Sequence, residues 1–106
     1  MEKLLRKKRN KYELLADLLE SSRGGARKTS MMFKSNLSFR LLNKYLDFLL
    51  ANGFLDKADG KYFPSEKGLL YLHRYSRYQK TKFDLQRSQE VIQSIVPARG
   101  GRGAGR

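Results

Sequence analysis

The sequence contains no cysteine and no tryptophan, and it has one histidine and two prolines among 106 residues. Without cysteine it can form neither disulfide bridges nor thiolate metal sites. The one histidine, His73, is expected on the surface of a long helix, and no cysteine accompanies it to ligate a metal or act as a nucleophile. We therefore expect no enzymatic activity, no metal and no other cofactor.

Long apolar runs are also lacking. No run approaches the roughly 20 residues that a membrane-spanning helix needs, and the start of the sequence lacks the apolar core of a signal peptide. We therefore expect a cytoplasmic protein.

Acidic residues are scarce: 10 Asp and Glu stand against 23 Lys and Arg, giving a net charge of +13. Residues 1–11 and 97–106 together carry +8 of this charge. Such an excess indicates a polyanionic partner, with nucleic acid the first choice and an anionic membrane the second.

Helix signals begin at Asn10, which forms a capping-box pattern with Glu13. Leucines at helical spacing follow, and the pair Gly24-Gly25 ends the pattern. This predicts a helix from Asn10 to about Ser22.

Two more short helices are predicted downstream. An extended segment over 26–29 leads to a brief helix over 30–35, the pair Asn36-Leu37 makes a tight turn, and Ser38 caps a helix over 39–52. Two short helices joined by a tight turn are what a helix-turn-helix requires.

A hairpin and a long helix complete the pattern. Asp59-Gly60 stands between two β-prone runs, 54–57 and 61–63, which predicts the "wing" that follows a helix-turn-helix in winged-helix proteins. Pro64 ends the second strand, and a final helix is predicted from Ser65 to Val96, about 48 Å long.

The final helix carries a coiled-coil seam, since residues recur along it in alternating steps of four and three. Lys82 and Gln89 interrupt this seam. Its remaining members are the candidate dimer interface: Tyr71, Tyr75, Tyr78, Leu85, Ile92 and Val96.

The helix over 39–52 is the predicted recognition helix. Projected at 100° per residue, its apolar side chains, with Phe39 and Phe48 among them, fill more than half of the circumference. We therefore expect a largely buried helix with one narrow polar strip, whose N-terminal part enters the major groove. In that strip Arg40 suits guanine or phosphate, and Asn43 suits adenine.

Further cations precede this helix and flank the tip of the wing, where contacts with the DNA backbone are expected. The complete set of candidate DNA-binding residues is Arg27, Lys28, Lys34, Ser38, Arg40, Asn43, Lys44, Lys57 and Lys61.

An ordered set of short motifs runs through Tyr12–Tyr75. The motifs are Glu13–Glu20, Gly25-Ala26, Lys28-Thr29, Met32-Phe33, Asn36–Phe39, Lys44–Leu46, Asn52-Gly53 and Glu66–Gly68. This set resembles the archaeal ten-kilodalton winged-helix chromatin proteins and related archaeal winged-helix regulators. The resemblance implies homodimers held by an antiparallel coiled coil of the last helices, and a nucleoid-organising role with low sequence preference.

The predicted fold class is thus mainly α (α+β): a winged helix-turn-helix with a long C-terminal helix that forms an antiparallel coiled-coil dimer. The predicted divisions are a basic leader (1–9), a winged-helix DNA-binding domain (10–68), a dimerisation helix (69–96) and a disordered Arg/Gly tail (97–106).

The predicted function is binding of double-stranded DNA in the nucleoid, with low sequence specificity. Three alternatives stay open: a sequence-specific transcription regulator, a basic winged-helix protein that binds RNA or the ribosome, and a protein-interaction module.

Overall fold

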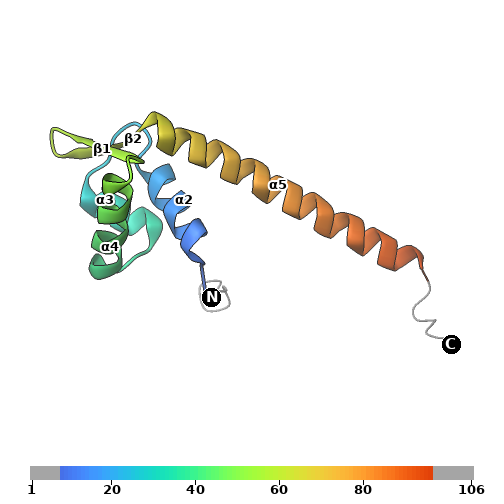
Figure 1. The fold of residues 1–106 in the computed structure, drawn as a ribbon. Coiled ribbons are helices and arrows are strands. Elements are labelled where there is room, and N and C mark those ends of the chain that lie inside the picture. Colours follow the sequence, from blue (N-terminus) through green and yellow to red (C-terminus); the bar gives the residue numbers. More distant parts are fainter. Residues whose placement is uncertain (1–7, 97–106) are drawn as a thin grey trace. The chain divides into compact units, whose positions relative to one another are not determined.

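The computed structural model describes residues 8–96, so the Arg/Gly tail and residues 1–7 of the basic leader lie outside the described residues. The chain divides into an N-terminal unit that ends at His73 and a C-terminal unit that starts at Arg74. Its elements are α2 (Lys11–Ser21), α3 (Lys28–Ser35), α4 (Phe39–Ala51), β1 (Leu55–Ala58), β2 (Lys61–Pro64) and α5 (Glu66–Ile95). The predicted fold class, mainly helical with one small antiparallel hairpin, is confirmed (Figure 1).

The predicted capping box at the start of α2 is confirmed. Asn10 Oδ1 accepts a hydrogen bond from the Glu13 backbone N–H at 2.9 Å, and the Asn10 backbone N–H donates to Glu13 Oε1 at 3.0 Å. These two bonds satisfy donors that a helix start leaves without intrahelical partners.

Helix α3 begins at Lys28, two residues earlier than predicted. The extended segment is short because only Ala26 pairs with the hairpin: its N–H donates to the Tyr62 carbonyl at 3.0 Å and its carbonyl accepts from the Tyr62 N–H at 2.7 Å. Arg27 is the last extended residue. At the other end α3 stops at Asn36, whose left-handed conformation (φ 54°) turns the chain toward α4.

The hairpin follows the prediction closely. Strands β1 and β2 pair antiparallel, with Ala58 opposite Lys61, so Asp59 and Gly60 form the two-residue loop. Both loop residues have positive φ, 51° and 75°, as a type I′ turn requires.

The core of the N-terminal unit is small. Figure 1 shows α2, α3 and α4 gathered beside the hairpin. The buried apolar side chains belong to Leu15, Ala16, Leu18, Leu19, Ala26, Met31, Leu42, Leu46, Leu49, Leu55, Tyr62 and Leu72. Leu72 lies on α5, so the N-terminal unit extends past the predicted boundary at residue 68 and includes the first two turns of that helix.

The start of α5 docks closely on the chain that follows α4. Ser65 Oγ accepts from the Gly68 N–H at 3.1 Å and donates to the Gly53 carbonyl at 2.5 Å, and the Ser65 N–H donates to the Phe54 carbonyl at 2.9 Å. Gly68 is buried directly against the same Phe54 carbonyl, and a Cβ at position 68 would overlap this oxygen and crowd Leu19.

Replacing Gly68 by alanine tests this docking. Helix propensity alone would make G68A more stable by about 1 kcal/mol. We expect instead a loss of roughly 1–3 kcal/mol, because the added methyl group overpacks a buried backbone contact. The measurement is urea unfolding followed by circular dichroism, with S76A at an exposed α5 position as the control. A G68A protein as stable as the wild type would contradict the close packing.

Candidate nucleic-acid interface

Helix α4 has one buried face, formed by Leu42, Leu46 and Leu49. The prediction of a largely buried helix is therefore wrong. Phe39 is 60% exposed and Phe48 42% exposed, although both were assigned to the buried arc. The physical reason is the size of the unit: α4 packs on α2 and β1, and these two elements cover one side of it only.

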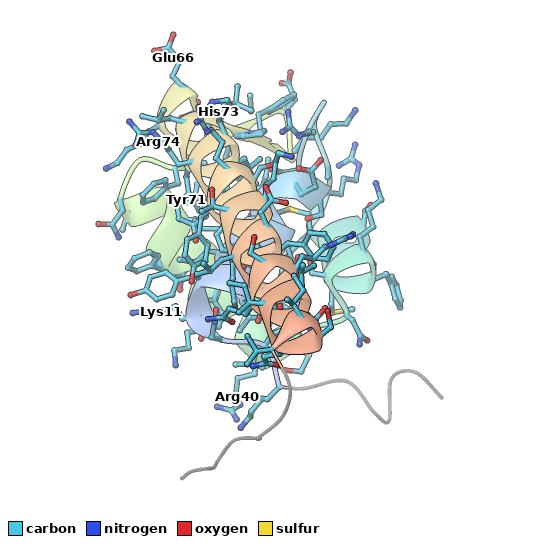
Figure 2. The ribbon with its side chains drawn as sticks, turned by 90° about the vertical axis from the view of Figure 1, so that its right-hand side faces the viewer. Lys11, Arg40, Glu66, Tyr71, His73 and Arg74 are labelled. Carbon is cyan, nitrogen blue, oxygen red and sulfur yellow. The ribbon has the colours of Figure 1, made fainter. Side chains whose placement is uncertain are left out.

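The N-terminal end of α4 presents the predicted polar side chains. Arg40 and Lys44 are exposed, Asn43 is half-buried, and the Arg40 side chain points into solvent (Figure 2). Ser38 is the N-cap, with its Oγ accepting from the Leu41 N–H at 3.2 Å. Ser38, which was predicted to contact DNA, therefore also stabilises the start of α4 as its N-cap.

The wing carries Lys57 and Lys61, both exposed near the two-residue turn. Lys57 Nζ lies 5.5 Å from the centre of the Tyr62 ring, which holds its aliphatic stem along the hairpin. Arg27 approaches the same turn: its Nη1 lies 3.1 Å from where a Cβ on Gly60 would stand. The structure thus brings Arg27, from the segment before α3, to the tip of the wing.

Lys28 connects this group of cations to α4. It directly follows Arg27, and its Nζ lies 5.4 Å from the centre of the Phe39 ring. Phe39 in turn directly precedes Arg40 in the chain. We call the residues joined in this way the cationic surface: Arg27, Lys28, Arg40, Lys57 and Lys61.

Two predicted residues lie apart from these contacts. Lys44 is one turn beyond Arg40, with its Nζ 5.6 Å from the centre of the Tyr45 ring. Lys34 lines a cleft between α2 and α3 together with Asp17 and Glu20. These two carboxylates already form ion pairs with arginines, Asp17 with Arg9 and Glu20 with Arg23.

Sequence reasoning missed one anchored cation, Arg9. It donates to Asp17 Oδ2 at 2.6 Å and to the Asn36 carbonyl at 3.0 Å, so it fixes the start of α2 against the turn between α3 and α4. The sequence alone could not show that Arg9 makes these contacts, because Arg9 stands in a run of basic residues beside Lys7 and Lys8.

Tyr71, assigned to the dimer seam, contacts its own N-terminal unit. Its hydroxyl donates to the Tyr12 carbonyl at 2.8 Å, and its ring meets Phe54 edge-on with 5.9 Å between the ring centres (Figure 2 labels Tyr71). These contacts give Tyr71 a role in packing the unit to which it belongs.

In the C-terminal unit every described side chain from Lys80 to Val96 is exposed. The exposed set includes the predicted seam residues Leu85, Ile92 and Val96, and also Ile95, which was not predicted. Tyr75 is half-buried, its hydroxyl accepting from Gln79 Nε2 at 2.6 Å, and its ring centre lies 6.1 Å from that of Tyr78.

Between residues 8 and 96 no three His, Cys, Asp or Glu side chains gather as metal ligands would. No described helix is both long and apolar enough to span a membrane.

Comparison with known proteins agrees with this geometry. An uncharacterized protein of Methanocaldococcus jannaschii, MJ0287, is 36% identical over 76 residues, which cover 70% of this chain and 78% of that protein. A second uncharacterized protein of the same organism, MJ0290, is 32% identical over 68 residues, 63% of this chain and 32% of the longer relative.

Among solved structures, Sso10a-2, a DNA-binding protein from Sulfolobus solfataricus, has a similar fold. The TM-score is 0.73 at 23% identity, over 85% of this chain and 99% of that one. These relatives confirm the resemblance to archaeal winged-helix proteins that the motifs over Tyr12–Tyr75 indicated.

Residues 8–83 match the family described as winged helix-turn-helix, and this range contains every element of the N-terminal unit. The chain therefore belongs to the winged helix-turn-helix family.

Proposed function

We propose that the protein binds double-stranded DNA through its N-terminal unit, with the N-terminal end of α4 in the major groove. The observation that carries this proposal is the cationic surface, in which contacts link the tip of the wing, the start of α3 and the start of α4. Membership of the winged helix-turn-helix family and the DNA-binding activity of Sso10a-2 support it.

Phosphate contacts dominate the proposed binding. Five cations stand where they can approach the backbone of the duplex: Arg27, Lys28, Lys44, Lys57 and Lys61. At the start of α4, Arg40 and Asn43 present hydrogen-bonding groups suited to base edges. Because phosphate contacts carry no direct sequence information, this balance favours low sequence specificity and a role in organising the nucleoid.

The cations also predict how binding depends on salt. Each neutralised phosphate contributes about −0.9 to the slope of log K against log [salt], so five contacts give about −4.5 for each N-terminal unit. The measurement is a fluorescence-anisotropy titration of a random-sequence duplex at several salt concentrations. A slope near zero would contradict phosphate-dominated binding.

Single substitutions separate the proposed roles. K44A should reduce the size of the salt slope by about 0.9, since one phosphate contact is lost. R40A should weaken binding by about tenfold, because it removes a charged, groove-facing side chain. The matched control is K67A: Lys67 donates to the Asn52 carbonyl at the opposite end of α4, and its loss should leave the slope unchanged.

The same titration with a duplex RNA competitor of equal sequence tests the main alternative. Displacement of DNA by an equal concentration of RNA would favour an RNA-binding protein. Selective retention of one palindromic duplex over random ones would favour a sequence-specific regulator.

We also propose that the protein is a homodimer that pairs through the part of α5 beyond Arg74. Tyr78, Leu85 and Ile92 recur every seven residues and are 58–60% exposed, an apolar stripe that a second helix would cover. Thr81, Ser88 and Ile95 flank this stripe on one side, and Lys82, Gln89 and Val96 flank it on the other. Thr81, Ser88 and Ile95 carry no charge. A dimer seam formed by the stripe and these three residues would therefore avoid burying the charge of Lys82.

Charges introduced into the stripe should therefore produce monomers. We expect L85D/I92D to sediment at half the mass of the wild-type dimer, because each aspartate would be buried against an apolar partner. The matched control is R87D/S94D, which places two aspartates at the same seven-residue spacing on the outer face of α5. Equal masses for L85D/I92D and the wild type would exclude this stripe as the interface.

If both proposals hold, the protein works in the nucleoid of the cytoplasm. A dimer would then hold two duplexes, or two segments of one duplex, through its two cationic surfaces.

A further inference from the structure

Phe39 is an exposed aromatic residue in an unexpected place. It is the first residue of α4, directly after the N-cap Ser38, and 60% of it is exposed. The helix buries Leu42, Leu46 and Leu49 instead, so the fold does not use Phe39 as a core residue. The proposed function places this end of α4 in the major groove, so the ring is available for contact there.

The surroundings of the Phe39 ring favour DNA as its partner. Lys28 Nζ lies 5.4 Å from the ring centre, and Arg40 is the next residue in the chain. Asn43 follows one helical turn later, on the same side of α4. The ring therefore stands among the side chains that the proposed function places at phosphates and base edges. A partner surface made of apolar protein would have to desolvate these cations, whereas DNA neutralises them.

The major groove offers one kind of apolar group that a phenyl ring can contact, the methyl group of thymine. Thymine carries a C5 methyl group there, whereas adenine, guanine and cytosine present only hydrogen-bonding groups and ring edges. We infer that Phe39 is a specificity-determining residue that packs on thymine methyl groups in the major groove. This inference rests on the proposed function and adds a preference for thymine to a surface that otherwise contacts phosphates.

The same contact would help the protein to distinguish DNA from RNA, because uracil lacks the methyl group. The preference would be modest. Removing one methyl group from water changes an equilibrium by about fourfold.

The test compares two duplexes that differ only in this methyl group. One is an A·T-rich duplex, and the other has the same sequence with deoxyuridine in place of thymidine, which keeps the hydrogen-bonding groups of the base edges. Binding is measured by fluorescence anisotropy at one fixed salt concentration. We expect the wild-type protein to bind the thymine duplex about fourfold more tightly for each methyl group contacted. For F39A we expect a ratio near one.

Phe33 provides the matched control. It is 74% exposed but lies on α3 rather than on α4, so F33A removes an equally large exposed ring and should keep the wild-type ratio. Circular dichroism and thermal melting show whether both variants fold. F39L, which keeps an apolar side chain, provides a second reading if F39A is unstable, and should retain part of the preference.

The outcomes separate this inference from the proposed function. Equal wild-type binding to both duplexes would overturn the role of Phe39 and leave DNA binding intact. A preference that persists in F39A would also overturn it, since the methyl groups would then be contacted elsewhere. Failure to bind either duplex would overturn both proposals.

Discussion

Leu18 and Leu19 of α2 pack in the same core as Leu42, Leu46 and Leu49 of α4, and the rest of the N-terminal unit depends on this apolar contact. All five side chains are at most 2% exposed. Because the unit is small, α2 and β1 cover only one side of α4. The opposite side is left to solvent, and it carries the groups proposed to meet DNA.

The same core holds the first two turns of α5. Gly68 rests on the Phe54 carbonyl and Leu72 is buried, so the first two turns of the helix are part of the N-terminal unit. Tyr71 strengthens this docking through Tyr12 and Phe54. One helix thus contributes its first turns to a folded core and its remaining turns, exposed and with apolar residues every seven positions, to a proposed partner helix.

Local patterns predicted the elements well where a few neighbouring residues decide the conformation. Asn10 with Glu13 located the start of α2, Asp59-Gly60 located the hairpin turn, and Ser65 located the start of α5. These signals act through hydrogen bonds or backbone angles within three residues. The boundary of α3 was misplaced because it depends on the pairing of Ala26 with Tyr62, thirty-six positions away in the chain.

The site was predicted less completely than the fold. A helical projection orders side chains around α4, but it does not tell how many neighbours cover the helix, so Phe39 was assigned to the core. The charges of Arg27 and Lys57 were evident, whereas the approach of Arg27 to the wing and the anchoring of Arg9 required three-dimensional contacts. The periodic position of Tyr71 likewise gave no sign of its contacts with Tyr12 and Phe54.

The backbone bridge between Ala26 and Tyr62 has a further consequence for recognition. It ties the hairpin to the segment from which Arg27 and Lys28 emerge, with two hydrogen bonds and no intervening loop. The backbone that carries these cations and the backbone of the hairpin are therefore held together. Their attachment points are set when the chain folds, so the backbone would lose little further conformational entropy in the proposed binding.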